Sequence, residues 1–273
     1  MRFSKKLLSA IRSFTNRRLK VLAYHGVTSS APSLYNVSTG QFREQMSVLK
    51  ERNYRVLPLC EAVERLYSNR LDKKSIVLTF DDANESIIDN AVPCLLELGF
   101  PASVFVPTGR VGANDVSWRK DKKNNTLDWD RLASLPNRGI DIHSHSVSHV
   151  DLTALDSRQL EYELRHSLET LRGRFGDSDY YLSYPFGRKN QNVASMARTV
   201  GYKGAFGFGA VLSNWRQTNP YQLKRETILA TTTIGQFKRK IDTSYDLIRC
   251  LRVHPAQELK RLVERITSKL GGE

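Results

Sequence analysis

Short apolar runs and amphipathic stretches alternate along most of the chain. The runs at 20–24, 75–80 and 102–106 are mainly apolar, which is typical of strands buried on both faces. Stretches such as 41–52 and 155–175 carry apolar residues at helical spacing. Strands that alternate with helices favour a parallel sheet with right-handed crossovers. The pattern therefore predicts an α/β domain.

The same pattern predicts the remaining elements and the organisation of the chain. Further strands are expected at 54–57, 204–206 and 223–229, and one runs into the histidines near 143. Further helices are expected at 59–67, 86–98, 129–135, 193–200, 234–241 and 257–270. Residues 20–243 would form the main domain, and residues 244–273 a helical extension packed on it.

The first 19 residues are predicted to form a basic amphipathic helix. Phe3, Leu7 and Ile11 fall at helical spacing among several lysines and arginines. Such a helix suits an anionic membrane leaflet, or it closes one end of the domain; both placements stay open. Arg12 interrupts the apolar stretch and no small-residue cleavage signal follows, so we do not expect a secretory signal.

Two adjacent carboxylates, Asp81 and Asp82, end the apolar strand at 75–80. An α/β scaffold usually places its chemistry at the carboxyl ends of strands. Neighbouring residues of an extended segment point apart, so one acid can bind a metal while the other faces a substrate. The alternative is a pair of aspartates that cap the following helix.

A cluster of histidines follows another predicted strand within 139–152. The cluster holds three of the six histidines in the chain: His143, His145 and His149. His145 and His149 are four residues apart, so a helical turn would place both imidazoles on one face. Together with Asp82 they would form a metal site with two histidines and one carboxylate. The alternative is a pair of histidines that only forms hydrogen bonds within a loop.

A third patch, at 181–187, ends a further predicted strand with the turn Tyr184-Pro185-Phe186-Gly187. All three patches therefore fall where strands end. This placement is expected of a barrel that carries its site at the carboxyl face.

These patches, in this order, resemble the motifs of the polysaccharide deacetylases, the NodB-homology proteins of carbohydrate esterase family four. The motif Thr-Phe-Asp-Asp-Gly is matched by residues 79–83, with alanine in place of glycine, and His-(Ser/Thr)-x-x-His by residues 145–149. The third motif, Arg-x-Pro-Tyr-Gly, is matched in part by residues 183–187. The resemblance spans residues 21–243 and implies a distorted, incomplete (β/α) barrel.

The resemblance implies roles for individual residues. Asp82, His145 and His149 would bind a divalent metal, with zinc expected first and cobalt, nickel, manganese or iron as alternatives. Asp81 would be the general base. Alanine at position 83 should be tolerated unless that residue needs a positive φ.

Two functional groups of the family are absent from their usual places. No Leu-x-x-His motif follows Tyr221, so His25, in an early Tyr-His motif typical of one subgroup, is assigned as general acid. His143 is the rival candidate for that role. The arginine of the third motif is also missing, and Arg225 would replace it. Whether Arg225 faces Asp81 or a surface carboxylate is left open.

A sugar pocket would be lined by aromatic and apolar side chains, because flat apolar surfaces suit the C–H faces of sugars. Tyr184, Pro185 and Phe186 are the candidates. Trp118 would cap the cleft or belong to the core.

Composition indicates the cellular compartment and the binding partners of the protein. Three scattered cysteines without Cys-x-x-Cys spacing indicate a reducing compartment. No apolar run approaches the length needed to cross a bilayer. The formal net charge of +14 favours an anionic membrane surface or a phosphate-bearing, lipid-linked glycan. The basic residues form no nucleic-acid motif, so we do not expect nucleic acid as a partner.

The resulting expectation is a metal-dependent de-N-acetylase of an N-acetylated amino sugar in a surface polysaccharide or its lipid-linked precursor. We expect it in the cytoplasm, bound peripherally at the inner face of the membrane. The alternatives are a non-catalytic sugar-binding relative and an amidohydrolase of a small non-carbohydrate amide.

Overall fold

The computed structural model describes residues 18–29, 33–113, 125–209 and 214–242. The predicted helices at 1–19 and 257–270 and the extension at 244–273 lie wholly or almost wholly outside these ranges. The α-helices are α2 (Thr39–Glu51), α3 (Leu59–Tyr67), α4 (Val92–Leu98), α5 (Trp129–Ala133), α6 (Ser157–Phe175), α7 (Gln191–Val200) and α8 (Ile234–Ile241). None of the helices within the described ranges is long and apolar enough to cross a membrane.

An eight-stranded, wholly parallel sheet forms the centre of the molecule. Its strands are β1 (Lys20–Tyr24), β4 (Arg55–Val56), β5 (Ser75–Asp81), β6 (Ala102–Val106), β7 (Ile140–Ser144), β8 (Tyr181–Ser183), β9 (Gly204–Phe208) and β10 (Leu223–Thr227). The strand order is β1-β10-β9-β8-β7-β6-β5-β4, and β1 also pairs with β5. This last pairing closes a ring of seven strands, with β4 outside it on β5. The predicted (β/α) barrel that falls short of eight strands is confirmed.

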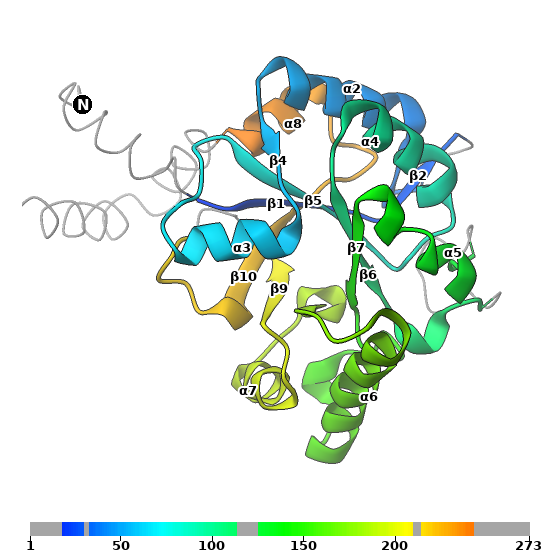
Figure 1. Ribbon diagram of the computed structural model, residues 1–273, viewed down its shortest axis with the longest axis vertical. Coiled ribbons are helices and arrows are strands. Elements are labelled where there is room, and N and C mark those ends of the chain that lie inside the picture. The colour runs from blue at the N-terminus through cyan, green and yellow to red at the C-terminus, as the bar shows by residue number, and fades with distance from the viewer. Residues whose placement is uncertain (1–17, 30–32, 114–124, 210–213, 243–273) are drawn as a thin grey trace, which may run out of the picture.

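Alternation along the strands separates two hydrophobic clusters, because successive side chains of a strand point to opposite faces. On β5, Val77 belongs to a cluster inside the barrel, whereas Ile76 and Leu78 belong to the layer beneath the helices. Buried side chains of α3 join the inner cluster and close one end of the barrel. Figure 1 shows α2, α4 and α8 together on one side of the barrel, and α6 and α7 on another.

The helix predicted at 86–98 forms as two parts. Residues Ile87–Ala91 make a π-helical segment, and α4 continues from it. Gly99 ends α4 in the left-handed conformation (φ 64°), as its position after the apolar stretch indicates. The strands of the large sheet and the other described α-helices agree with the predicted ones to within a few residues. The small parallel pair of β2 (Gly26–Thr28) and β3 (Asn36–Ser38) was not predicted, because a polar loop was expected there.

Candidate active site

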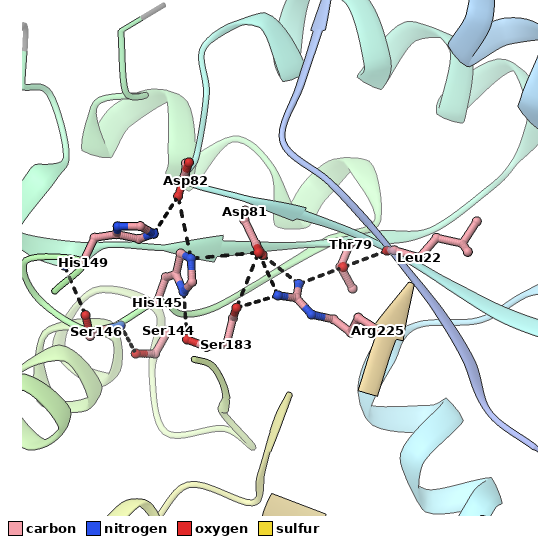
Figure 2. Close-up of polar contacts among 10 residues, drawn as sticks. All are labelled: Leu22, Thr79, Asp81, Asp82, Ser144, His145, Ser146, His149, Ser183 and Arg225. Carbon is pink, nitrogen blue, oxygen red and sulfur yellow. Dashed lines mark hydrogen bonds and ion pairs between the residues drawn. The ribbon is translucent and has the colours of Figure 1, made fainter. Parts of the chain in front are cut away.

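The carboxyl ends of β5 and β7 bring the aspartate pair and the histidines together. Asp81 is the last residue of β5, and His145 directly follows β7. Both strands pair with β6 in parallel, so their carboxyl ends open at the same end of the barrel. Figure 2 shows the side chains of Asp81, Asp82, His145 and His149 turned toward one another.

Asp82, His145 and His149 form the candidate metal centre. Each offers one ligand atom, and the three atoms all lie within 4.8 Å of one another. Oδ1 of Asp82 is 3.4 Å from Nε2 of His149 and 3.7 Å from Nε2 of His145. The three side chains expected to share an ion therefore converge on one point.

The chemistry of this donor set fits a divalent cation. Nδ1 of His145 lies 2.7 Å from the carbonyl oxygen of Ser183, which can only accept, so Nδ1 carries the proton and Nε2 keeps its lone pair. Burial lowers the pKa of His145, and burial lowers that of His149 to about 4. Both imidazoles are therefore neutral at pH 7, as metal ligands must be.

The chain reaches this centre through left-handed backbone. Asp82 has φ 68° and the fully buried Ala83 has φ 48°. Position 83 thus needs the positive φ at which glycine would be favoured, and the chain adopts it with an alanine. Alanine was expected to be tolerated here unless the residue needs a positive φ. The residue does need one, so Ala83 carries backbone strain.

The two histidines are not joined by a helical turn, and that part of the sequence prediction is wrong. Ser146 (φ 66°) and His149 (φ 58°) are left-handed, and residues 145–149 belong to no helix. The imidazole rings nevertheless meet, with centroids 4.7 Å apart. Side chains outside the turn fix its conformation, which the spacing of the histidines could not show.

Asp81 forms a bidentate ion pair with Arg225 of β10. Nη1 of Arg225 donates to Oδ1 and Nη2 to Oδ2, both at 2.7 Å, and both side chains are fully buried. Nη2 also donates to the hydroxyl of Ser183 at 2.6 Å, and Nη1 to that of Thr79 at 3.1 Å. The question left open by the sequence is therefore settled, because Arg225 faces Asp81 (Figure 2).

The surroundings of the pair keep Asp81 ionised. Burial alone would raise its pKa, but the charge of Arg225 and the Arg225 hydrogen bonds outweigh burial. The pKa is therefore held well below its usual range. The guanidinium carbon of Arg225 lies 4.9 Å from the Phe105 ring centroid and 5.1 Å from that of Phe208. These rings shield the ion pair from water and favour the cation.

His25, the predicted general acid, lies directly after β1. Its ring contacts Tyr35 and Phe208, at centroid distances of 5.0 and 6.5 Å. The Phe208 ring also contacts the guanidinium of Arg225, so His25 lies on the same side of the site as the Asp81–Arg225 pair. Its Nδ1 is buried and has no hydrogen-bond partner within the described ranges.

His143, the rival acid, is an interior residue. It packs against Phe105 and Tyr181, each at 5.5 Å between ring centroids, and the Tyr181 amide donates to its Nδ1 at 3.5 Å. Burial lowers its pKa to about 3. It is thus a neutral histidine of the barrel core, and the geometry favours His25.

The turn after β8 differs from the expected sugar-binding surface. Tyr184 is fully buried and donates its hydroxyl to the Tyr221 carbonyl at 3.0 Å, and Pro185 is also buried. Phe186 is 47% exposed, and its ring meets that of His149 at 4.8 Å. Phe186 alone of these three is available to a ligand. Trp118 lies outside the described residues.

Sequence reasoning missed two polar residues of the site. Ser183 stands where the family motif has arginine, and it contacts both members of the Asp81–Arg225 pair. Glu163, on α6, binds the turn between His145 and His149. A glutamate at a buried helix position was the available signal, because such a residue needs polar partners.

Comparisons with known proteins support the architecture. A family model described as polysaccharide deacetylase matches residues 68–205, just over half of the chain. YxkH of Bacillus subtilis (strain 168) is 27% identical over 187 residues, which cover 68% of this chain and 63% of YxkH. The poly-β-1,6-N-acetyl-D-glucosamine N-deacetylase of Staphylococcus aureus (strain MSSA476) is 28% identical over 178 residues, covering 63% and 61%. The chain thus spans less than two thirds of these relatives.

Solved structures share the fold. Deacetylase PplD of Streptococcus pyogenes, solved in complex with acetate, superposes with a TM-score of 0.72 at 22% identity, over 82% of this chain and 98% of PplD. IcaB of Ammonifex degensii superposes with a TM-score of 0.71 at 23% identity, over 84% and 96%. At these identities the likeness establishes the (β/α) barrel.

Proposed function

The chain belongs to the polysaccharide deacetylase family, and on that premise we propose that it removes N-acetyl groups from amino sugars of a glycan. The observation that carries the proposal is the convergence of Asp82, His145 and His149 beside the Asp81–Arg225 pair. The Staphylococcus aureus relative is named for a polymer of N-acetylglucosamine. Such a polymer is therefore the first substrate to test.

Asp82, His145 and His149 would hold a divalent cation, with zinc the first choice for two imidazoles and one carboxylate. Such a cation, when bound, supplies Lewis-acid polarisation of the acyl carbonyl and activation of water. The chain keeps the imidazoles neutral by burying them. The Ser183 carbonyl holds the ring of His145 in the orientation that presents Nε2.

Asp81 acts as the general base in this proposal. Its carboxylate takes a proton from the attacking water while the water oxygen bonds to the acyl carbon. Arg225 holds the carboxylate ionised and fixes both of its oxygens. Because the pKa of Asp81 is low, its carboxylate is a weak base. It can take the proton only from a water molecule whose own pKa is lowered.

His25 acts as the general acid. It delivers a proton to the sugar nitrogen as the carbon–nitrogen bond breaks, which releases acetate and a free amine. Its position after β1, beside the Phe208 ring that also contacts Arg225, supports this role. Phe186, exposed beside His149, supplies an apolar surface for a sugar ring.

We also propose a place in the cell at which the enzyme binds its glycan substrate. The formal net charge of +14 supports an anionic setting, such as the inner face of a membrane that carries a lipid-linked glycan. In that setting the enzyme would modify an intermediate of surface-polysaccharide synthesis.

The test is release of acetate by the purified full chain supplied with Zn²⁺ or Co²⁺. The substrates are β-1,6-linked N-acetylglucosamine oligomers, and both acetate and new amines are measured. We expect D81N to lose activity by roughly 10²–10⁴-fold, as removal of a general base does. We expect H149A to lose at least about 100-fold, because metal polarisation supplies several kcal/mol.

Three results would contradict the proposal. Metal-loaded protein that releases no acetate from any N-acetylhexosamine substrate is not a deacetylase of this class. Sugar binding without turnover, unchanged in D81N, would identify a non-catalytic relative. Hydrolysis confined to non-carbohydrate amides would identify the amidohydrolase alternative.

A further inference from the structure

Helix α6 directs a buried carboxylate at the turn between His145 and His149. The side chain of Glu163 belongs to a residue that is 6% exposed. Its Oε2 accepts the backbone N–H groups of Val147 and Ser148, both at 2.9 Å, and its Oε1 accepts the Ser148 hydroxyl. Within the described part of the chain, Glu163 forms no ion pair with lysine or arginine. Its hydrogen bonds all go to this turn.

A buried carboxylate without a cation is costly unless hydrogen bonds replace its water. Here the replacement comes from two successive backbone N–H groups that converge on one oxygen. Such convergence needs an unusual backbone, and the left-handed Ser146 (φ 66°) supplies it. The anion and the strained turn therefore stabilise each other.

The other polar groups of the turn are also occupied. The carbonyl of Ser146 accepts from the Thr108 amide at 3.0 Å and from the Ser167 hydroxyl at 3.1 Å. The carbonyl of Val147 accepts from the Gly109 amide at 2.9 Å. The turn is thus held between the segment after β6 on one side and α6 on the other.

This turn determines where His149 lies. The amide of His149 donates to the Ser146 hydroxyl at 3.2 Å, so the residue leaves the turn in a fixed direction. Its imidazole then reaches Asp82. Loss of the Glu163 carboxylate would leave two partly buried N–H groups without an acceptor, and the turn would have to rearrange to satisfy them.

We propose that Glu163 is a positioning residue of the metal centre. It holds residues 146–148 in the conformation that brings His149 to His145 and Asp82 before any ion binds. The inference rests on the proposed function in one respect, that these three residues bind a divalent cation. The protein then loses little conformational entropy when the ion binds, which raises the affinity for the ion.

The test compares metal affinity across four full-length proteins: wild type, E163A, E163Q and E169Q. The probe is Co²⁺, added to metal-free protein, with affinity measured by competition against a chelating dye and the site followed by its absorption spectrum. We expect E163A to bind Co²⁺ about 10–100-fold more weakly, as loss of an outer partner of a ligand does. Its spectrum at saturation should change, because His149 is displaced.

The glutamine and control variants separate positioning from folding. E163Q keeps an oxygen acceptor for the two N–H groups, so it should lose less affinity than E163A. Glu169 is an exposed residue of the same helix, so E169Q should match the wild type. If E163A does not fold, E163D, whose shorter side chain cannot make all three bonds, replaces it.

The outcomes are distinct. A folded E163A or E163D with wild-type affinity and spectrum would overturn the inference, even if its unfolding temperature were lower. Wild-type protein that binds no Co²⁺ would overturn both the inference and the proposed function. Tight Co²⁺ binding without acetate release would contradict the proposed function only, and the comparison of variants would stand.

Discussion

Arg225 supplies from β10 the guanidinium that the family's third motif would supply from the position of Ser183. The small hydroxyl at 183 leaves space in which the guanidinium reaches Asp81 and also donates to Ser183 itself. A fully buried ion pair of this kind contributes little net stability compared with an apolar pair. The pair fixes the orientation and the charge of Asp81. Removal of either partner is destabilising, because it leaves an uncompensated buried charge.

Removal of Arg225 alone should therefore lower the free energy of unfolding strongly. Removal of both charges should lower it much less. R225A leaves Asp81 as an unpaired buried carboxylate, and we expect the free energy of unfolding to fall by about 3–5 kcal/mol. In the D81N background, the same substitution should cost markedly less. Urea denaturation of the wild type, both single variants and the double variant measures this coupling. Additive losses would show that the two side chains do not interact as described.

Phe186 should affect substrate rather than stability. Its ring is exposed beside His149, so F186A removes a surface for the sugar and little core. We expect kcat/KM to fall by about 2–10-fold, which corresponds to an aromatic contact of about 0.5–1.5 kcal/mol. The control is Y162A, which removes an exposed aromatic ring from α6 (57% exposed). Equal losses in the two variants would argue against a sugar contact at Phe186.

At the scale of elements, turns decide the geometry of this site more than helices or strands do. The turn that carries His149 and the turn that carries Phe186 both use left-handed residues. The neighbouring strands β7 and β8 bring these turns near each other, but packing against α6 and β9 gives each its conformation.

Gly187 follows Phe186 with φ 68°, and a Cβ there would lie 2.6 Å from Phe208 Cδ2 and 2.9 Å from the Phe208 amide nitrogen. Gly139 has a similar φ of 73° but open space around it. We expect G139A to cost about 1 kcal/mol for the left-handed backbone, and G187A roughly 1–3 kcal/mol more for the overlap. Thermal unfolding compares the two directly. Equal losses would mean that the turn yields to the added methyl group at little cost.

At the scale of the whole molecule, the closed barrel brings together residues that are far apart in the chain. Asp81 and Arg225 meet because β1 lies between β5 and β10 in the ring. Parallel strands place every carboxyl end at one face, so motifs spread over much of the chain share one site. The chain that forms this site is strongly basic.

The formal net charge of +14 predicts salt-dependent binding to anionic membranes. In flotation assays at low salt, the full chain should bind vesicles that contain phosphatidylserine, because each basic residue near such a surface contributes about 1 kcal/mol. Binding should disappear near 0.5 M NaCl, where charges are screened within about 4 Å. Vesicles of phosphatidylcholine alone are the control. Similar binding to both vesicle types would contradict an electrostatic attachment.

The sequence by itself determined the α/β alternation and the three metal-ligand candidates, and the resemblance of its motifs to the family implied the barrel. These followed from local information, because buried parallel strands are apolar runs and their carboxyl ends carry chemistry. Asp81, Asp82, His145 and His149 directly end or follow such runs, so their convergence required only the parallel sheet.

Only the tertiary structure decided how each side chain is used. It placed Arg225 on Asp81, separated His25 from the interior His143, and buried Tyr184 while exposing Phe186. It also showed that the turn between the two histidines is not helical and that its amides donate to Glu163. These contacts join residues from different elements, and their strength depends on burial and on partners. Spacing along the chain encodes neither.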